Sequence, residues 1–166
     1  MVRITKLYGM NGEYWRMDST DARIVSILID NGRSTVLEIS ELIGLSPTPV
    51  SRRIRKLEET GVITRYSALL DETKMGFGVS VFVSVKLEKQ IDNDLANFET
   101  AIHDLPEVVD CWLMTGNRDY LLRVATRSLA EFEQFLTGKL TRISSVASIE
   151  SSIPLRRVKA GIARSE

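Results

Sequence analysis

The apolar positions in the first half of the chain recur with the 3.6-residue period of amphipathic helices. The first predicted helix begins near Asp21, after the possible capping residues Asp18, Ser19 and Thr20, and ends at Asn31-Gly32. A second helix covers about residues 35–43 and ends at Gly44. The residues expected to face inward from these two helices are Ile24, Val25, Leu28, Ile29, Leu37 or Ile39, Leu42 and Ile43.

The third predicted helix lies in the stretch LSPTPVSRRIRKLEETGVI, residues 45–63. Ser46 suits the N-cap, and two prolines follow within the first turn, where N–H groups have no partner inside the helix and a proline loses no hydrogen bond. Gly61 ends the helix. The buried stripe is formed by Val50, Ile54 and Leu57, with Arg53 at its edge. This stripe leaves the other face to Thr48, Ser51, Arg52, Arg55 and Lys56.

The arrangement of these three helices is typical of a helix-turn-helix. They are short, a tight turn over residues 44–46 precedes the third, and that helix exposes a basic and hydroxyl-bearing face. Residues 62–70 are expected to form a short extended arm or wing. The polar, glycine-bearing segment 71–78 is expected to mark a domain boundary.

The second half of the chain changes to alternating strands and helices. Strands are predicted at residues 79–87, 107–115, 119–126 and 146–153, and helices at 93–104 and 128–140. The helix residues expected to face inward are Leu95, Phe98, Ile102, Leu129, Phe132, Leu136 and Leu140. The order βαββαβ indicates a ferredoxin-like sheet with helices on one face only. The other face, with Phe82, Trp112 and Met114, would have to be covered, most simply by a second copy.

The predicted fold class is therefore α+β, with a three-helix helix-turn-helix (winged-helix-like) domain followed by a ferredoxin-like domain with an antiparallel sheet. The expected organisation is an N-terminal extension (1–17), a helix-turn-helix domain (18–66), a linker (67–78), a βαββαβ effector-binding and oligomerisation domain (79–160) and a tail (161–166).

Composition narrows the function classes. The chain has 166 residues, of which 43% are hydrophobic and 27% charged, so it can form a core. No apolar run is long enough for a membrane span, and the N-terminus lacks the apolar segment of a signal peptide, so the cytoplasm is expected. A single Cys and a single His exclude an internal disulfide and the usual zinc finger. Cys111 is expected to point into the core, and no catalytic arrangement, metal site or cofactor is predicted.

The positive charge is focal rather than general. The net charge is zero over the whole chain but +4 within residues 52–56, from Arg52, Arg53, Arg55 and Lys56. Such a cluster suits DNA phosphates, and hydrogen-bonding side chains at the start of the helix suit base edges. Base contacts are expected from Thr48, Ser51 and Arg52, phosphate contacts from Arg52, Arg55 and Lys56, and a further phosphate site at the helix N-terminus, at Ser46. Arg53 fits a structural ion pair or a phosphate contact equally, and the blander alternative for the cluster is a solvated face partnered by Glu58 and Glu59.

Several motifs, in order and at matching spacing, resemble the Lrp/AsnC (leucine-responsive/asparagine, or feast/famine) family of transcription factors. In the first domain they are Asp21 with Ile24, Asn31-Gly32-Arg33, Glu41-Leu42-Ile43-Gly44-Leu45-Ser46, and Arg53-Ile54-x-x-Leu57-Glu58-x-x-Gly61-Val62-Ile63; in the second they are Pro106-Glu107-Val108 and Thr115-Gly116-x-x-Asp119-Tyr120. The resemblance covers residues 18–160, about 85% of the chain. Residues 1–16 are an addition, and Ser40 and Arg118 replace a usual alanine and a common aromatic.

This resemblance implies a sequence-specific regulator that reads double-stranded operator DNA and changes its activity on binding an amino acid. It also implies homodimers, formed through the sheet, that assemble into octamers or similar rings with the effector between dimers. The implied effector residues form one turn: Thr115, Gly116, Asn117, Arg118 and Asp119. From the residues alone this turn also fits a plain hairpin, and Arg118 fits either a carboxylate contact or a blocked pocket. The alternative function is a stand-alone amino-acid-binding module whose helical domain binds protein.

Overall fold

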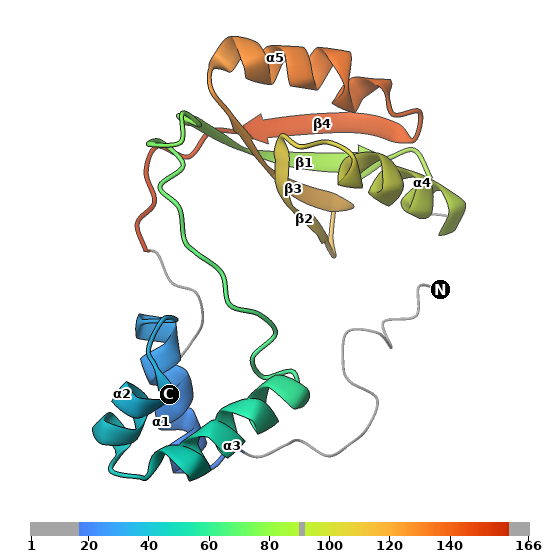
Figure 1. Cartoon of the computed structure of the whole chain (residues 1–166). Coiled ribbons are helices and arrows are strands. Elements are labelled where there is room, and N and C mark those ends of the chain that lie inside the picture. Colours follow the sequence, from blue (N-terminus) through green and yellow to red (C-terminus); the bar gives the residue numbers. More distant parts are fainter. Residues whose placement is uncertain (1–16, 90–91, 160–166) are drawn as a thin grey trace. The chain divides into compact units, whose positions relative to one another are not determined.

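The computed structural model describes residues 17–89 and 92–159, so residues 1–16 of the predicted N-terminal extension and the whole predicted tail, residues 161–166, lie outside the described residues. The chain divides into two compact units: one runs up to Leu69 and also includes the described Lys159, and the other runs from Leu70 to Val158. The first contains α1 (Ser19–Asp30), α2 (Val36–Ile43) and α3 (Pro47–Glu59). The second contains β1 (Val79–Leu87), α4 (Asp92–His103), β2 (Val108–Leu113), β3 (Tyr120–Thr126), α5 (Leu129–Gly138), a 3-10 turn (Leu140–Arg142) and β4 (Val146–Ser152) (Figure 1).

Local signals in the sequence define the ends of the first three helices. Asp18 caps α1, where its carboxylate accepts a hydrogen bond from the Asp21 N–H at 2.8 Å. Thr35 and Glu38 form a reciprocal capping box at the start of α2. Gly44, with φ of 76°, ends α2 in the left-handed region that favours glycine. The turn into α3 is therefore fixed by local chemistry.

The three helices share a small core. Ile24, Ile39, Val50 and Leu57 are fully buried at its centre, and Ile54 packs against them, as predicted. The expectation that Leu42 faces inward is wrong, because its side chain is 62% exposed. Ile39, Val36 and Ile43 already fill the inward face of this two-turn helix, so Leu42 faces outward.

The arm predicted after α3 contains no wing strand. Residues 62–70 adopt neither helix nor strand, although Ile63 packs against the core of the first unit. The segment that follows is attached to the second unit through Glu72, whose carboxylate accepts a hydrogen bond at 2.7 Å from the guanidinium of Arg123 on β3. The same guanidinium also donates to Asp110 on β2 at 2.7 Å. The chain therefore passes from one unit to the other through a stretch without regular structure.

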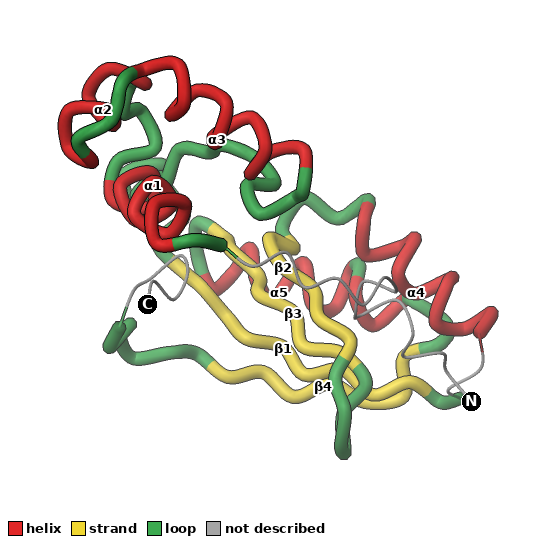
Figure 2. Tube along the Cα trace, turned by 90° about the horizontal axis from the view of Figure 1, so that it is seen from below, coloured by secondary structure: helices red, strands yellow, loops and turns green. Residues whose placement is uncertain are grey.

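The second unit has the predicted ferredoxin-like topology. The strand order is β2-β3-β1-β4, and every neighbouring pair is antiparallel (Figure 2). Alternate residues of β1 and β3 pack with α4 and α5 into one core, which includes the fully buried Val83, Leu122 and Phe98. Both helices therefore cover the same face of the sheet, which leaves the opposite face to polar groups and to Trp112 and Met114, each more than 40% exposed.

Two predictions for side chains in this unit are wrong. Leu129 was expected to face inward, but it is 59% exposed, and Phe135 is buried instead. Leu129 is the first residue of α5, and a side chain in a first turn extends past the core that the later turns cover. Cys111 is exposed rather than a core residue, because it lies on β2, which is an edge strand. None of the described helices is long and apolar enough to cross a membrane.

Candidate nucleic-acid interface and ligand turn

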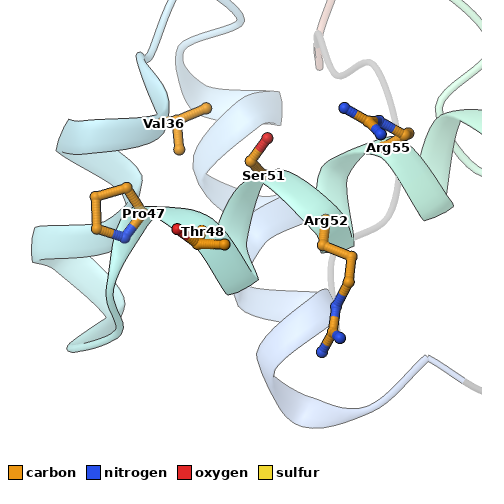
Figure 3. A pocket seen from close by; sticks show the side chains of 6 residues that line it. All are labelled: Val36, Pro47, Thr48, Ser51, Arg52 and Arg55. Atoms are coloured by element: carbon orange, nitrogen blue, oxygen red, sulfur yellow. The ribbon is translucent and has the colours of Figure 1, made fainter.

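The exposed face of α3 brings four predicted site residues into one stripe. Thr48, Ser51, Arg52 and Arg55 are spaced three, four and seven residues apart, so they lie on one side of the helix, away from the buried stripe. They line an open depression together with Pro47 and with Val36 from α2 (Figure 3). The stripe therefore carries two hydroxyl groups towards the N-terminus of α3 and two guanidinium groups immediately after them.

The two arginines of this stripe have no protein partner within residues 17–89 and 92–159. Arg52 and Arg55 are both exposed, and neither makes a hydrogen bond or an ion pair there. Glu58, which was considered as a local partner, instead accepts a hydrogen bond from the Tyr66 hydroxyl at 2.9 Å. The blander interpretation, a face neutralised by its own helix, therefore has no ion pair to support it at these two positions.

Arg53, on the same helix, has a different environment. One of its guanidinium nitrogens, Nη1, lies 2.6 Å from an Asp18 carboxylate oxygen and 2.8 Å from an Asp21 carboxylate oxygen. These hydrogen bonds, that to Asp21 first, raise the pKa of Arg53, and the Asp21 N–H together with Arg53 lowers the pKa of Asp18. Of the two alternatives that the sequence left open, the structure shows the ion pair, which fixes α3 against the start of α1.

The N-terminus of α3 offers fewer donors than an ordinary helix start. Ser46 occupies the N-cap position but makes no side-chain cap hydrogen bond. Pro47 and Pro49 have no N–H, so only Ser46 and Thr48 contribute amide donors among the first four positions. Hydroxyl groups at positions 46 and 48 are exposed beside them. An anion at this end would therefore be held by two amides and two hydroxyls rather than by a full ring of amides.

The turn between β2 and β3 combines an open loop with a buried anchor. Gly116 has φ of 110°, a conformation that side-chain-bearing residues rarely adopt. Asp119 is only 4% exposed, and its carboxylate accepts a hydrogen bond from the Leu87 N–H at 2.7 Å, while its own N–H donates to the Val85 carbonyl at 2.9 Å. Of the five predicted turn residues, Asp119 is therefore a structural tie to β1.

Arg118 of this turn is engaged by the last strand. Its two terminal nitrogens donate to the Ser148 hydroxyl at 2.9 Å and to the Glu150 carboxylate at 2.7 Å. Thr115, Gly116 and Asn117 are exposed. The open part of the turn thus lies next to an ion pair in which Glu150 is exposed and Arg118 is partly exposed.

Sequence reasoning missed three carboxylates that complete these sites. Asp18 and Asp21 were recognised as helix-start residues but not as partners of Arg53, and Glu150 was not singled out. The bonds from Arg53 span 35 and 32 residues and that from Arg118 to Glu150 spans 32. No local pattern in the sequence points to contacts at that separation.

Comparison with known proteins gives two family matches and many relatives. A model described as winged helix-turn-helix DNA-binding matches residues 17–64, and one described as Lrp/AsnC ligand binding domain matches residues 80–163. The chain is 46% identical to the Bkd operon transcriptional regulator of Pseudomonas aeruginosa over 142 residues, covering 86% of this chain and 93% of that protein. It is 36% identical to the leucine-responsive regulatory protein of Rhizobium meliloti, covering 86% and 92%. A transcriptional regulator of Neisseria meningitidis, solved with L-Met, superposes with a TM-score of 0.84 at 32% identity, covering 88% of this chain and 94% of that one.

Proposed function

Because the chain belongs to the Lrp/AsnC family of transcriptional regulators, we propose that it reads operator DNA with the exposed stripe of α3. The observation that carries this assignment concerns Arg52 and Arg55, which lie on the same stripe as Thr48 and Ser51 and make no hydrogen bond or ion pair with any described residue. The helix-turn-helix match over residues 17–64 disfavours the alternative of an amino-acid-binding module whose helices bind protein.

The side chains in and around α3 have different roles in this proposal. The N-terminal turns of a recognition helix enter the major groove, so the hydroxyls of Thr48 and Ser51 and the guanidinium of Arg52 reach base edges. Arg55 and Lys56 lie further along the helix and bind phosphates. Ser46 binds a phosphate at the helix start with its free hydroxyl and amide. Arg53 holds α3 in place through its ion pairs instead of contacting DNA.

A single such module reads only a few base pairs, so the proposal includes assembly. A symmetric homodimer places two modules on half-sites about one helical turn apart, ~34 Å. The exposed sheet face with Trp112 and Met114 supplies an apolar surface for pairing two copies. Dimers then assemble into a larger ring, an octamer, which binds long stretches of DNA through several modules at once.

The second unit is proposed to bind an amino acid that modulates DNA binding. Two relatives support this ligand class: one is called leucine-responsive, and one was solved with L-Met. In this chain the ligand's carboxylate would take the place of Glu150 on Arg118, and its ammonium group would contact the released Glu150. The exposed residues Thr115, Gly116 and Asn117 border that position, and Asp119 keeps the turn in place.

The test is a fluorescence-anisotropy titration of the full chain on the DNA upstream of its own gene and on an unrelated duplex. The wild type is expected to prefer the upstream DNA, and the Arg52→Ala/Arg55→Ala variant to lose that preference. The matched control is Arg142→Ala, which removes an exposed cation from the second unit and should bind as the wild type does. Equal preference in wild type and double variant would contradict the assignment of α3.

The same titration, repeated with a panel of free amino acids, tests the ligand turn. At least one amino acid is expected to shift the affinity of the wild type, and Arg118→Gln is expected to abolish that shift while leaving ligand-free DNA binding intact. An unchanged response in Arg118→Gln would refute the role of Arg118. A panel without any effect on the wild type would refute the ligand class.

A further inference from the structure

Charge in the second half of the chain is sharply divided. Residues 71–152 carry 13 Asp and Glu against 8 Lys and Arg, a net charge of −5. Residues 153–166 carry 4 Lys and Arg against 1 Asp or Glu, a net charge of +3. A body with this much negative charge repels DNA, whereas the segment that follows it attracts DNA. The end of the chain thus differs in charge from the domain to which it is attached.

The described part of this end, residues 153–159, is here called the basic segment. It contains Arg156, Arg157 and Lys159, which are all exposed. Across the part of the chain that the structure describes, these three cations make no hydrogen bond or ion pair. The segment has neither helix nor strand, and its Leu155 is fully exposed. None of the described residues therefore neutralises these charges.

The register of the sheet places the basic segment close to the connection between the two units. Ser152, the last residue of β4, pairs with Phe82, which is three residues into β1. The segment therefore leaves the sheet at the end where the chain from the helical unit enters (Figure 1). Seven residues reach at most about 24 Å. The three cations are thus tethered at the point from which the DNA-binding unit is also tethered.

We propose that the basic segment is a second, sequence-independent DNA contact, which binds phosphates beside the half-site that α3 reads. This inference rests on the proposed function, since it needs DNA held by the helical unit. A cation tethered near a bound duplex meets phosphate at high effective concentration. Each phosphate that it neutralises releases counterions and adds affinity without base preference. The segment also offsets the repulsion between DNA and the acidic domain.

The experiment compares the full-length wild type with Arg156→Gln/Arg157→Gln/Lys159→Gln by anisotropy, on the upstream DNA and on an unrelated duplex, over a range of salt concentrations. The slope of log affinity against log salt is expected to become shallower by about 0.9 for each lost contact. For three contacts, the wild type loses ~40-fold more affinity than the variant between about 50 and about 200 mM salt. The preference for upstream over unrelated DNA should stay the same.

A matched control removes three exposed cations from the body of the second unit: Lys86→Gln/Lys89→Gln/Arg142→Gln. It changes the net charge equally, and its salt slope is expected to match that of the wild type. Equal slopes in the tail variant and the wild type, or equal losses in both triple variants, would overturn the proposal. The proposal would also be overturned if the tail variant sedimented with a different oligomeric state but kept the wild-type salt slope. The segment, in which Leu155 and Val158 are exposed, would then bind protein rather than DNA.

The failure of this inference can be told apart from failure of the proposed function. If the wild type prefers its upstream DNA but the tail variant keeps the wild-type salt slope, only the role of the basic segment is wrong. If the wild type binds neither duplex, the proposed function and this inference fall together.

Discussion

Replacing Arg53 by methionine should destabilise the helical unit without removing a DNA contact. Its guanidinium donates to Asp21, whose side chain is only 7% exposed, and to Asp18, whose side chain is 50% exposed. A hydrogen bond between charged groups in a largely buried place contributes about 1.5–3 kcal/mol, whereas the ion pair with the exposed Asp18 adds little. Methionine keeps the aliphatic packing but leaves the buried carboxylate without its cation, so we expect a loss of about 3 kcal/mol.

The assay is urea unfolding of the full chain, followed by the helical circular dichroism signal. The matched control is Arg55→Met, which makes the same substitution two residues away, at an exposed site where no described residue forms a hydrogen bond or ion pair with the arginine. This control should change the free energy of unfolding by no more than about 0.5 kcal/mol. In DNA titrations the roles reverse: Arg55→Met should make the salt slope shallower by about 0.9, and Arg53→Met should leave it unchanged. Equal unfolding midpoints for both variants, or a shallower slope for Arg53→Met, would refute the reasoning.

Three further predictions concern single groups elsewhere in the chain. Although Cys111 is exposed on its edge strand, the protein shields part of its thiol from water, and this partial desolvation, followed by the negative charge of Glu99, raises the pKa of the thiol to about 11. Alkylation near pH 8 should therefore be ~100-fold slower than for a free cysteine, and a rate equal to that of free cysteine would contradict this. Arg123→Met should release the segment around Glu72 and accelerate limited proteolysis there, and unchanged cleavage would show that the ion pairs are dispensable. Hydrogen bonds from Thr35 lower the pKa of Glu38, so the stability that they contribute is present above the unfolded pKa of about 4.3 and is lost as the pH falls through the folded value. Glu38→Gln should therefore lose less stability than the wild type between about pH 5 and about pH 3. Parallel curves of stability against pH for the two proteins would refute this.

The sequence alone was enough to predict the order of elements and both architectures. Periods of 3.6 and 2 residues distinguish the helices from the strands, and residues such as Gly44 and Asp18 define ends that the structure confirms. The errors fall where the pattern is ambiguous. Leu42 and Leu129 fit an apolar stripe, yet both are exposed, because the neighbouring elements decide how much of a short helix is covered.

For the candidate site as well, some features could be predicted from the sequence and others could not. The α3 stripe could be predicted, because helical spacing alone places Thr48, Ser51 and Arg52 on one face. The partners of Arg53 and Arg118 could not, because their carboxylates come from helices and strands more than 30 residues away in sequence. Whether an exposed arginine is available to a ligand therefore depends on tertiary contacts that a single sequence does not show.

The most direct test of the central claim is a base-pair substitution scan of the upstream half-site, measured with the wild type and with Arg52→Ala. If the stripe of α3 reads bases, the wild type discriminates at particular positions, and Arg52→Ala loses discrimination of about 1–3 kcal/mol at one of them while keeping the others. If both proteins show the same pattern of discrimination at every position, Arg52 does not read bases and the assignment of the recognition surface is wrong.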